Sequence, residues 1–163
     1  MAALALPIIW RDSDDKNIYE KERINRIFNA IKPNRYPRAI VKATCSLHVQ
    51  EAVRLANRLQ CRVSVRSGGH SWAAWSLRDN VILIDLEELN EIELDEDTRI
   101  VKVSPSTTGM QLNESLGIKG LMFGGGHCPD VGLGGFLLQG GMGWNCKVFQ
   151  ILRGDTDEIM AYW

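Results

Sequence analysis

RSGGHS, residues 66–71, follows directly on a predicted strand and decides how the whole chain is interpreted. Its paired glycines, Gly68 and Gly69, let the backbone turn so that several N–H groups converge on one point, which suits a phosphate or pyrophosphate. The side chains of Arg66 and Ser67 would add further donors. On the hexapeptide alone, a tight turn that carries a surface histidine is an equally good interpretation.

A second glycine-rich stretch, GGGHCPDVGLGGFLLQGGMG, runs from residue 124 to residue 143 and holds most of the chain's 15 glycines. Each glycine in regular structure costs about 0.5–1 kcal/mol relative to alanine, so such a cluster needs a reason. A dinucleotide supplies one, because side chains would block the backbone from its pyrophosphate. The stretch contains neither GxGxxG nor a Gly-Lys-Ser/Thr ending, which excludes a Rossmann or P-loop interpretation.

The segment before RSGGHS predicts a strand–helix–strand unit. A helix is expected over Ile18–Ile31, before Pro33, and a short strand over Ala39–Ala43. Ser46 is the expected N-cap of the next helix, and Arg62–Ser67 the second strand. The unit is therefore a small parallel βαβ with RSGGHS in the loop at the carboxyl end of its second strand.

The segment between the two glycine-rich stretches predicts a mixed α+β pattern. Its expected elements are a buried strand over Val81–Leu86, a hairpin of Ile92–Leu94 and Ile100–Val103, and a short helix from Thr108 to Gly117 that a Thr108–Gln111 capping box opens. After Asn145, neither a strand nor a well-capped helix is recognisable.

Composition bounds the class of protein. With 163 residues, 45% hydrophobic and 24% charged, the chain has the size and balance of one globular domain. The net charge of −1 provides no basic excess for nucleic acid. Leu4–Trp10 is too short to span a bilayer and lacks the flanks of a signal peptide. We expect no nucleic-acid or membrane partner, and the scattered cysteines without a signal favour an intracellular protein; the oligomeric state is not indicated.

The two runs RSGGHSWAAWS (residues 66–76) and GGGHCPDVGLGGFLLQGGMGWN (residues 124–145), in this order, carry a resemblance. They resemble the berberine-bridge-enzyme-like branch of the vanillyl-alcohol-oxidase (PCMH-type) flavoprotein family. The likeness extends over about Ile18 to Asn145. It implies an α+β PCMH-type FAD-binding domain, with a complete first subdomain and an incomplete second one.

The resemblance also implies which residues hold the cofactor. His70 would be bonded to the 8α-methyl carbon of the flavin and Cys128, through sulfur, to its C6, so that FAD is attached at two points. Imidazole and thiolate are nucleophiles that suit these bonds, and converging N–H groups would favour the thiolate. The expected cofactor-binding residues are Arg66, Ser67, Gly68, Gly69, His70, Ser71, Cys128, Val131, Gly132, Gly134, Gly135, Gly140 and Gly141.

Other interpretations of these residues stay open. Cys128 would alternatively be a buried structural thiol, the common state of a free cysteine. His127 beside it invites a metal site, but adjacent residues rarely direct two ligands at one tetrahedral centre, so no metal is expected. A nucleotide-binding module without redox chemistry is a further alternative, although it leaves the placement of His70 and Cys128 unexplained.

The resemblance stops at Asn145, whereas members of the family continue through a substrate domain. We expect residues 1–32 to form an N-terminal helical arm and residues 33–163 an FAD-binding domain that ends in a divergent tail, 146–163. The implied function is FAD binding with oxidase activity on a small alcohol or sugar-like substrate, with oxygen as acceptor. The alternative is a truncated, inactive FAD-binding fragment without the substrate domain. No catalytic acid or base is nominated.

Overall fold

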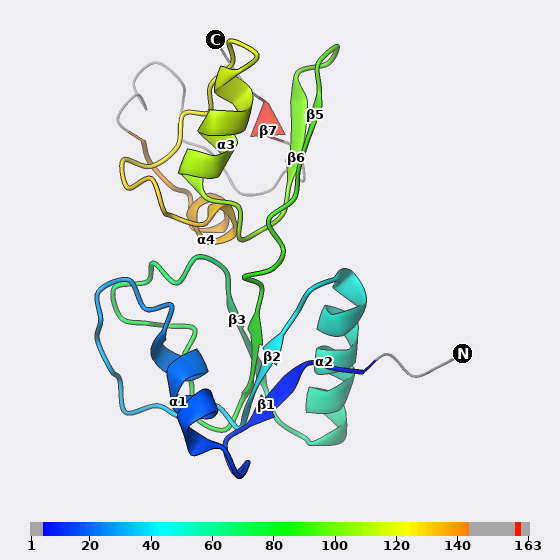
Figure 1. Cartoon of the computed structure of the whole chain (residues 1–163), viewed down its shortest axis with the longest axis vertical. Helices are drawn as coiled ribbons and strands as arrows, with labels where there is room; N and C mark the ends of the chain where they lie inside the picture. The colour runs from blue at the N-terminus through cyan, green and yellow to red at the C-terminus, as the bar shows by residue number, and fades with distance from the viewer. Residues whose placement is uncertain (1–4, 144–158, 161–163) are drawn as a thin grey trace. The chain divides into compact units, whose positions relative to one another are not determined.

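Two units make up the chain in the computed structural model, which describes residues 5–143 and 159–160. Unit 1 is Met1–Glu88 and unit 2 is Leu89–Trp163, and each has its own sheet and helices (Figure 1). Helices and strands alternate irregularly in both, which confirms the α+β class. None of the helices in the described ranges is long and apolar enough to cross a membrane.

The sheet of unit 1 has four strands in the order β1-β2-β4-β3. They are β1 (Ile8–Trp10), β2 (Ala39–Lys42), β3 (Val63–Arg66) and β4 (Ile82–Asp85). β4 is parallel to both β2 and β3, whereas β1 is antiparallel to β2. The register aligns Lys42, Asp85 and Arg66, the last residues of the three parallel strands, in one row at the carboxyl edge of the sheet.

Helices α1 (Lys16–Ile24) and α2 (Ser46–Arg58) flank this sheet (Figure 1). Asp15 caps α1 by accepting hydrogen bonds from the backbone N–H groups of Asn17 and Ile18. Tyr19 of α1 packs with Ile40 and Leu83 in the core of unit 1. This core holds the row of strand ends in place.

Three features of unit 1 differ from the sequence prediction. β4 lies between β2 and β3, so the two strands of the βαβ unit are parallel but not neighbours. Helix α1 ends at Ile24 rather than Ile31, because the chain turns there, with the N–H of Ile27 bonded to the carbonyl of Ile24. The N-cap of α2 is Cys45, with Ser46 already inside the helix.

Unit 2 contains the predicted hairpin and capped helix. Strands β5 (Ile92–Asp95) and β6 (Ile100–Val103) are antiparallel, and α3 (Gly109–Gly117) starts with both hydrogen bonds of the Thr108–Gln111 capping box. A short helix, α4 (Leu133–Leu138), lies within the glycine-rich stretch. Val101, Leu112, Leu116, Phe123 and Leu133 form the buried core of this unit.

A short strand, β7 (Ile159–Met160), pairs antiparallel with β6, although the tail showed no strand pattern. A strand of two residues is too short to show alternation, and β7 is defined by its pairing with β6. Residues 144 and 145 of the second run, and the remainder of the 146–163 tail, lie outside the described residues.

Candidate functional site

The RSGGHS loop follows β3, and an internal contact explains one of its glycines. Gly69 has a φ of +73°, and a Cβ built on it would lie 1.8 Å from the carbonyl oxygen of Arg26. The N–H of Phe28 also points to the carbonyl of Gly69, at 3.5 Å. A glycine is therefore required at position 69 by the main chain of Arg26, independently of any ligand.

The side chain of Arg66, which the sequence predicts to add donors for a pyrophosphate, points into unit 1. It is 1% exposed. Its guanidinium donates to the carbonyl oxygens of Glu22 (2.6 Å) and Arg23 (2.8 Å) and to a carboxylate oxygen of Asp85 (2.7 Å). Arg66 thus anchors the start of the loop from inside unit 1, because these acceptors turn its charge away from the surface.

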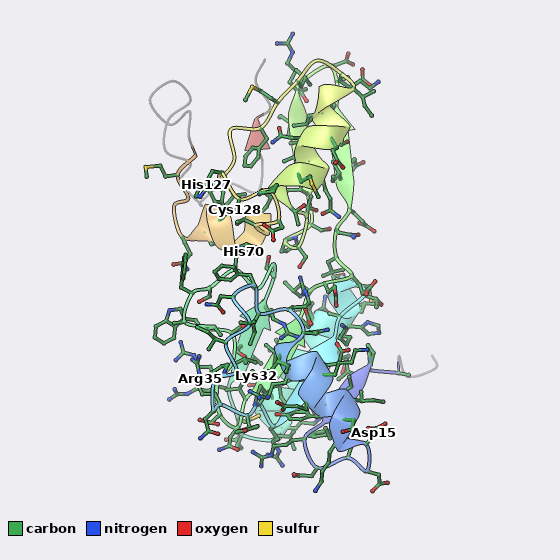
Figure 2. All side chains as sticks on the ribbon, turned by 60° about the vertical axis from the view of Figure 1, so that its left-hand side comes forward. Asp15, Lys32, Arg35, His70, His127 and Cys128 are labelled. Carbon is green, nitrogen blue, oxygen red and sulfur yellow. The ribbon has the colours of Figure 1, made fainter. Side chains whose placement is uncertain are left out.

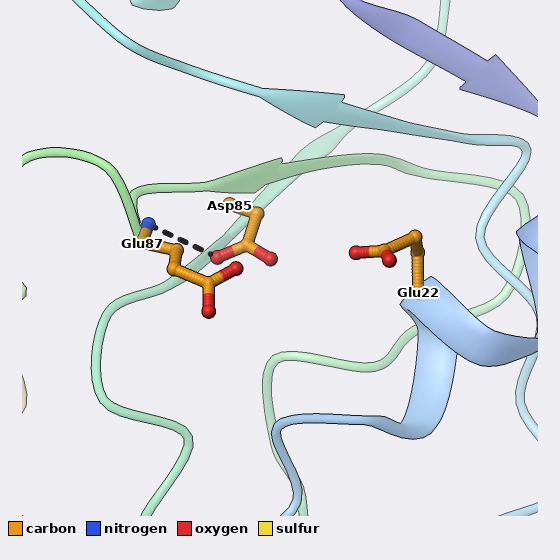
Figure 3. Close-up of side chains that lie close together, drawn as sticks. All are labelled: Glu22, Asp85 and Glu87. Atoms are coloured by element: carbon orange, nitrogen blue, oxygen red, sulfur yellow. Dashed lines mark hydrogen bonds between the residues drawn. The ribbon is translucent and has the colours of Figure 1, made fainter.

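Figure 3 shows three carboxylates, Glu22, Asp85 and Glu87, that face one another beside this loop. Such a trio has the composition of a metal site, yet the ammonium of Lys42 lies 2.8 Å from Glu22, 2.6 Å from Glu87 and 3.9 Å from Asp85. Burial lowers the pKa of Lys42, but the carboxylates outweigh it and leave the pKa above its usual value. Lys42 therefore already supplies the cation that this cluster needs.

Arg26 connects this cluster to the loop. Its guanidinium bonds to the buried carboxylate of Asp85 and donates to the carbonyl oxygen of Ser67 at 2.5 Å. The loop is consequently tied to the end of β4 through one side chain. Ser71 is tied within the loop, because its hydroxyl accepts the N–H of Trp75 at 3.1 Å.

His70 is half-buried and stacks on an aromatic ring (Figure 2). The centroids of its imidazole and the ring of Phe28 are 4.6 Å apart, and the two planes differ by 13°. One face of the imidazole is thus covered. Phe28 was assigned by the sequence to an amphipathic helix, so its contact with His70 was not predicted.

Cys128 is a free, half-buried thiol in unit 2, in the loop that leads to α4. This loop is fastened to the start of α3: the N–H of Gly109 donates to Val131 (3.2 Å) and that of Met110 to Pro129 (2.8 Å). Thr108 and Gly132 form an isolated bridge. The backbone that follows Cys128 is therefore fixed by the start of α3, which the capping box predicted.

The glycines around α4 fall into two groups. A Cβ on Gly141 would meet the ring of Phe136 at 2.4 Å, and one on Gly126 would meet it at 3.0 Å. By contrast, no heavy atom of the described chain outside the immediate neighbours lies within 4 Å of a Cβ on Gly135 or Gly140. The first group makes room for an aromatic ring of the protein itself. The second has open space beside the backbone, and Gly140 also has a φ of +72°.

The remaining expected residues of this stretch have structural contacts. Gly132 is buried as the N-cap of α4, and the N–H of Gly134 donates to the carbonyl of Pro105 at 2.8 Å. A depression of about 400 Å³ lies between α3 and residues 126–129, and Asn113, Glu114 and His127 are in its wall. His127 and Cys128 are labelled in Figure 2.

The structure brings the expected residues together in two groups. Residues 66–71 belong to unit 1, and Cys128 with the glycines of the second stretch belongs to unit 2. The contacts of Arg26, Phe28 and Asp85 with the first group were missed. Asp85 did leave a signal, because it is a charged residue within an otherwise apolar run, Val81–Leu86.

Comparison with known proteins gives one consistent answer. Residues 37–157 match the model of a family described as FAD binding domain. The FAD-linked oxidoreductase nodO of Hypoxylon pulicicidum is 46% identical over 142 residues, which are 87% of this chain and 32% of that protein. The chain thus spans about a third of the length of this relative.

Solved structures agree on the fold. The 6-hydroxy-D-nicotine oxidase of Arthrobacter nicotinovorans superimposes with a TM-score of 0.79 at 23% identity, over 93% of this chain and 33% of that one. The xylooligosaccharide oxidase of Myceliophthora thermophila C1, in complex with xylobiose, has a TM-score of 0.74 at 30% identity, over 91% of this chain and 30% of that one.

Proposed function

Because this chain belongs to the FAD binding domain family, we propose that its two glycine-rich loops hold FAD and that His70 and Cys128 form bonds to the flavin. The resemblance to FAD-linked oxidoreductases, with FAD as the cofactor, is confirmed. The two attachment points and the binding residues go beyond that family assignment and are proposals.

The observation that carries the proposal is the fit of the described residues to a bulky dinucleotide. His70 and Cys128 are each half-buried, which holds the side chain in place and keeps it reachable. Gly135 and Gly140 leave open space where a side chain would stand. These are the features that a covalently held flavin requires: accessible nucleophiles and a backbone without side chains beside them.

The chemistry of attachment balances with oxygen as the oxidant. A bond forms between a ring nitrogen of His70 and the 8α carbon of the flavin, and one N–H and one C–H proton are lost. The Cys128 bond likewise replaces one S–H and one C–H. Each bond leaves two electrons on the isoalloxazine, and molecular oxygen removes them together with two protons as hydrogen peroxide. When bound, the flavin supplies the redox chemistry and the protein supplies orientation.

The activity proposed for the whole protein is that of an oxidase acting on a hydroxyl group of a small molecule, with oxygen as acceptor. A sugar-like substrate is favoured by the 30% identity to an oxidase whose structure holds xylobiose. An FAD-binding protein without turnover, for which the matched FAD binding domain is the support, is the second candidate. Oxygen consumption with xylobiose as a probe separates the two.

The decisive experiment incubates the 163-residue chain with FAD, denatures it in acid and measures the flavin absorbance that stays with the protein. Flavin is expected to remain with the wild type and with each of His70→Ala and Cys128→Ala, and to be lost in the double variant. Mass spectrometry of proteolytic peptides locates each bond. Cys61→Ala, which changes another half-buried free thiol, is the matched control.

Two results contradict the proposal. One is a colourless denatured wild type after incubation with FAD in air. The other is flavin that survives in the double variant, because it would place the attachment elsewhere in the chain. Loss of flavin in Cys61→Ala would show that unfolding, and not chemistry, explains a colourless variant.

A further inference from the structure

The turn after α1, residues 25–29, contacts most of the loop that carries His70. Its main chain presses against Gly69, its Arg26 side chain holds the carbonyl of Ser67, and its Phe28 ring covers one face of His70. Beyond them, the side-chain amide of Asn29 donates to the carbonyl of Trp72 at 3.0 Å. One short segment thus fixes both the path of the loop and the plane of its imidazole.

We propose that Phe28 is a positioning residue for His70, which sets the imidazole plane for bond formation with the flavin; this rests on the function proposed above. The near-parallel stack, at 4.6 Å and 13°, restricts rotation of the imidazole about its last side-chain bond on the covered side. That plane limits the two ring nitrogens to two sets of directions, which are related by a half-turn of the ring. A nucleophile must approach its carbon along one direction, so this constraint acts on the attachment rate.

The exposure of Phe28 argues that its ring does more than fill the core. The residue is 40% exposed, so its burial contributes less to folding than that of a fully buried core side chain. By comparison, the neighbouring core residue Ile27 is 6% exposed. Positioning of the His70 imidazole accounts for a large aromatic side chain at this partly exposed place. Edge-on contact with Trp72, at 5.3 Å, holds the ring of Phe28 in turn.

The turn itself is anchored from the sheet. Asp85, at the end of β4, is fully buried and binds the guanidinium of Arg26, which reaches on to Ser67. The path from β4 to the loop therefore consists of two charge-assisted contacts, which are stronger than neutral hydrogen bonds. Phe28 follows Arg26 by two residues, so the same anchor places its ring.

The test compares Phe28→Leu with Phe28→Tyr. Leucine removes the flat partner of His70, whereas tyrosine keeps the ring and points its hydroxyl to solvent. The attachment rate is measured as acid-stable flavin against time, in a Cys128→Ala background that leaves His70 as the proposed attachment point. We expect this rate to fall about 10- to 100-fold in Phe28→Leu and to be restored in Phe28→Tyr. Ile18→Ala, which truncates a 48%-exposed apolar residue on α1, is the matched control.

A second readout needs no flavin. In the wild type the ring current of Phe28 is expected to shift the carbon-bound protons of His70 upfield in the NMR spectrum. Phe28→Leu should abolish that shift, and Phe28→Tyr should keep it, with other amide signals of unit 1 unchanged. His70 protons that do not move in Phe28→Leu, or an unchanged attachment rate there, overturn the inference. If the wild type attaches no flavin, the proposed function fails, and the NMR arm still decides the positioning.

Discussion

At the scale of single residues, Gly69 has the sharpest consequence. Replacing it with alanine puts a Cβ at 1.8 Å from a main-chain oxygen, so either the loop or the turn after α1 must move. We expect Gly69→Ala to lower the free energy of unfolding, measured in urea, by clearly more than the ~1–2 kcal/mol that a left-handed alanine costs by itself.

Gly120→Ala is the control for that prediction. Gly120 has nearly the same φ, +68°, but nothing lies within 4 Å of its added Cβ. Its substitution is expected to cost only the backbone term, about 1–2 kcal/mol. Equal losses in the two variants would show that the contact with Arg26 is not the reason for a glycine at position 69.

The family resemblance, which rests on the two glycine-rich motifs, singled out His70 and Cys128 as the expected attachment points. It did not predict the contacts of Phe28 with His70 and of Arg26 with Ser67, since Phe28 and Arg26 lie about forty positions earlier and have an ordinary helical pattern around them. Contacts between distant segments depend on how the sheet brings them together, and no local pattern records that. The internal acceptors of Arg66 were not predicted either, for the same reason.

At the scale of elements, α4 tests whether open glycines serve a ligand. Gly135 lies within this helix and has free space around its Cα, so Gly135→Ala should keep or slightly raise stability, by about 0.5–1 kcal/mol. The affinity for FAD is measured by fluorescence titration in a His70→Ala/Cys128→Ala background, with and without Gly135→Ala. We expect Gly135→Ala to lower this affinity, because the added methyl group occupies space that the ligand needs.

Gly141→Ala is expected to behave in the opposite way. Its Cβ would meet the ring of Phe136 at 2.4 Å, so the substitution should lower the melting temperature whether or not FAD is present. A Gly135→Ala variant that is less stable than Gly141→Ala would contradict this division of the glycines.

Helix α1 carries a prediction on pH. Burial raises the pKa of Tyr19 to about 12, against the opposing charges of Arg23 and Arg11, and its hydroxyl donates to the carbonyl of Pro37 at 2.7 Å. In the unfolded chain the phenol ionises near pH 10, so between pH 10 and 12 the folded state binds the extra proton. Its contribution is therefore complete below pH 10 and is lost as the pH rises through 12.

The measurement is the free energy of unfolding as a function of pH between 9 and 12, in wild type and Tyr19→Phe. The wild type is expected to lose stability more steeply above pH 10 than the variant, although Lys42 and other groups contribute a shared slope. Parallel curves would show that Tyr19 ionises equally easily in both states.

The elements were largely predictable where a pattern is local. The alternation and apolar runs gave β2, β3, β4 and the hairpin, and the Thr108–Gln111 pair gave the start of α3. Strand β1 was missed because three residues carry almost no periodicity. The order of the strands was missed for another reason: β4 enters between β2 and β3 through pairing that only the folded sheet determines.

At the scale of the whole molecule, the two units have separate cores. Leu83 belongs to the core of unit 1 and Leu112 to that of unit 2, and both are fully buried. Leu83→Ala and Leu112→Ala are each expected to cost about 2–5 kcal/mol, and their effects should add in the double variant, since they share no partner. Urea unfolding followed by hydrogen exchange measures each unit separately.

A pair within one core provides the comparison. Ile40 and Leu83 face each other across β2 and β4 and lie in the same cluster. The double variant Ile40→Ala/Leu83→Ala should depart from additivity by about 0.5–3 kcal/mol, because both changes open the same space. Equal coupling within and between the cores would show that the two cores are not energetically independent.

The contact at Gly69 also has a genetic consequence. The atom that excludes a side chain there is the carbonyl oxygen of Arg26, which every amino acid carries. No replacement at position 26 can therefore create space, whereas a lost ring at Phe28 can be compensated by another aromatic residue. A screen for restored function should therefore recover other aromatic residues at position 28, and for Gly69 variants should return little besides glycine itself.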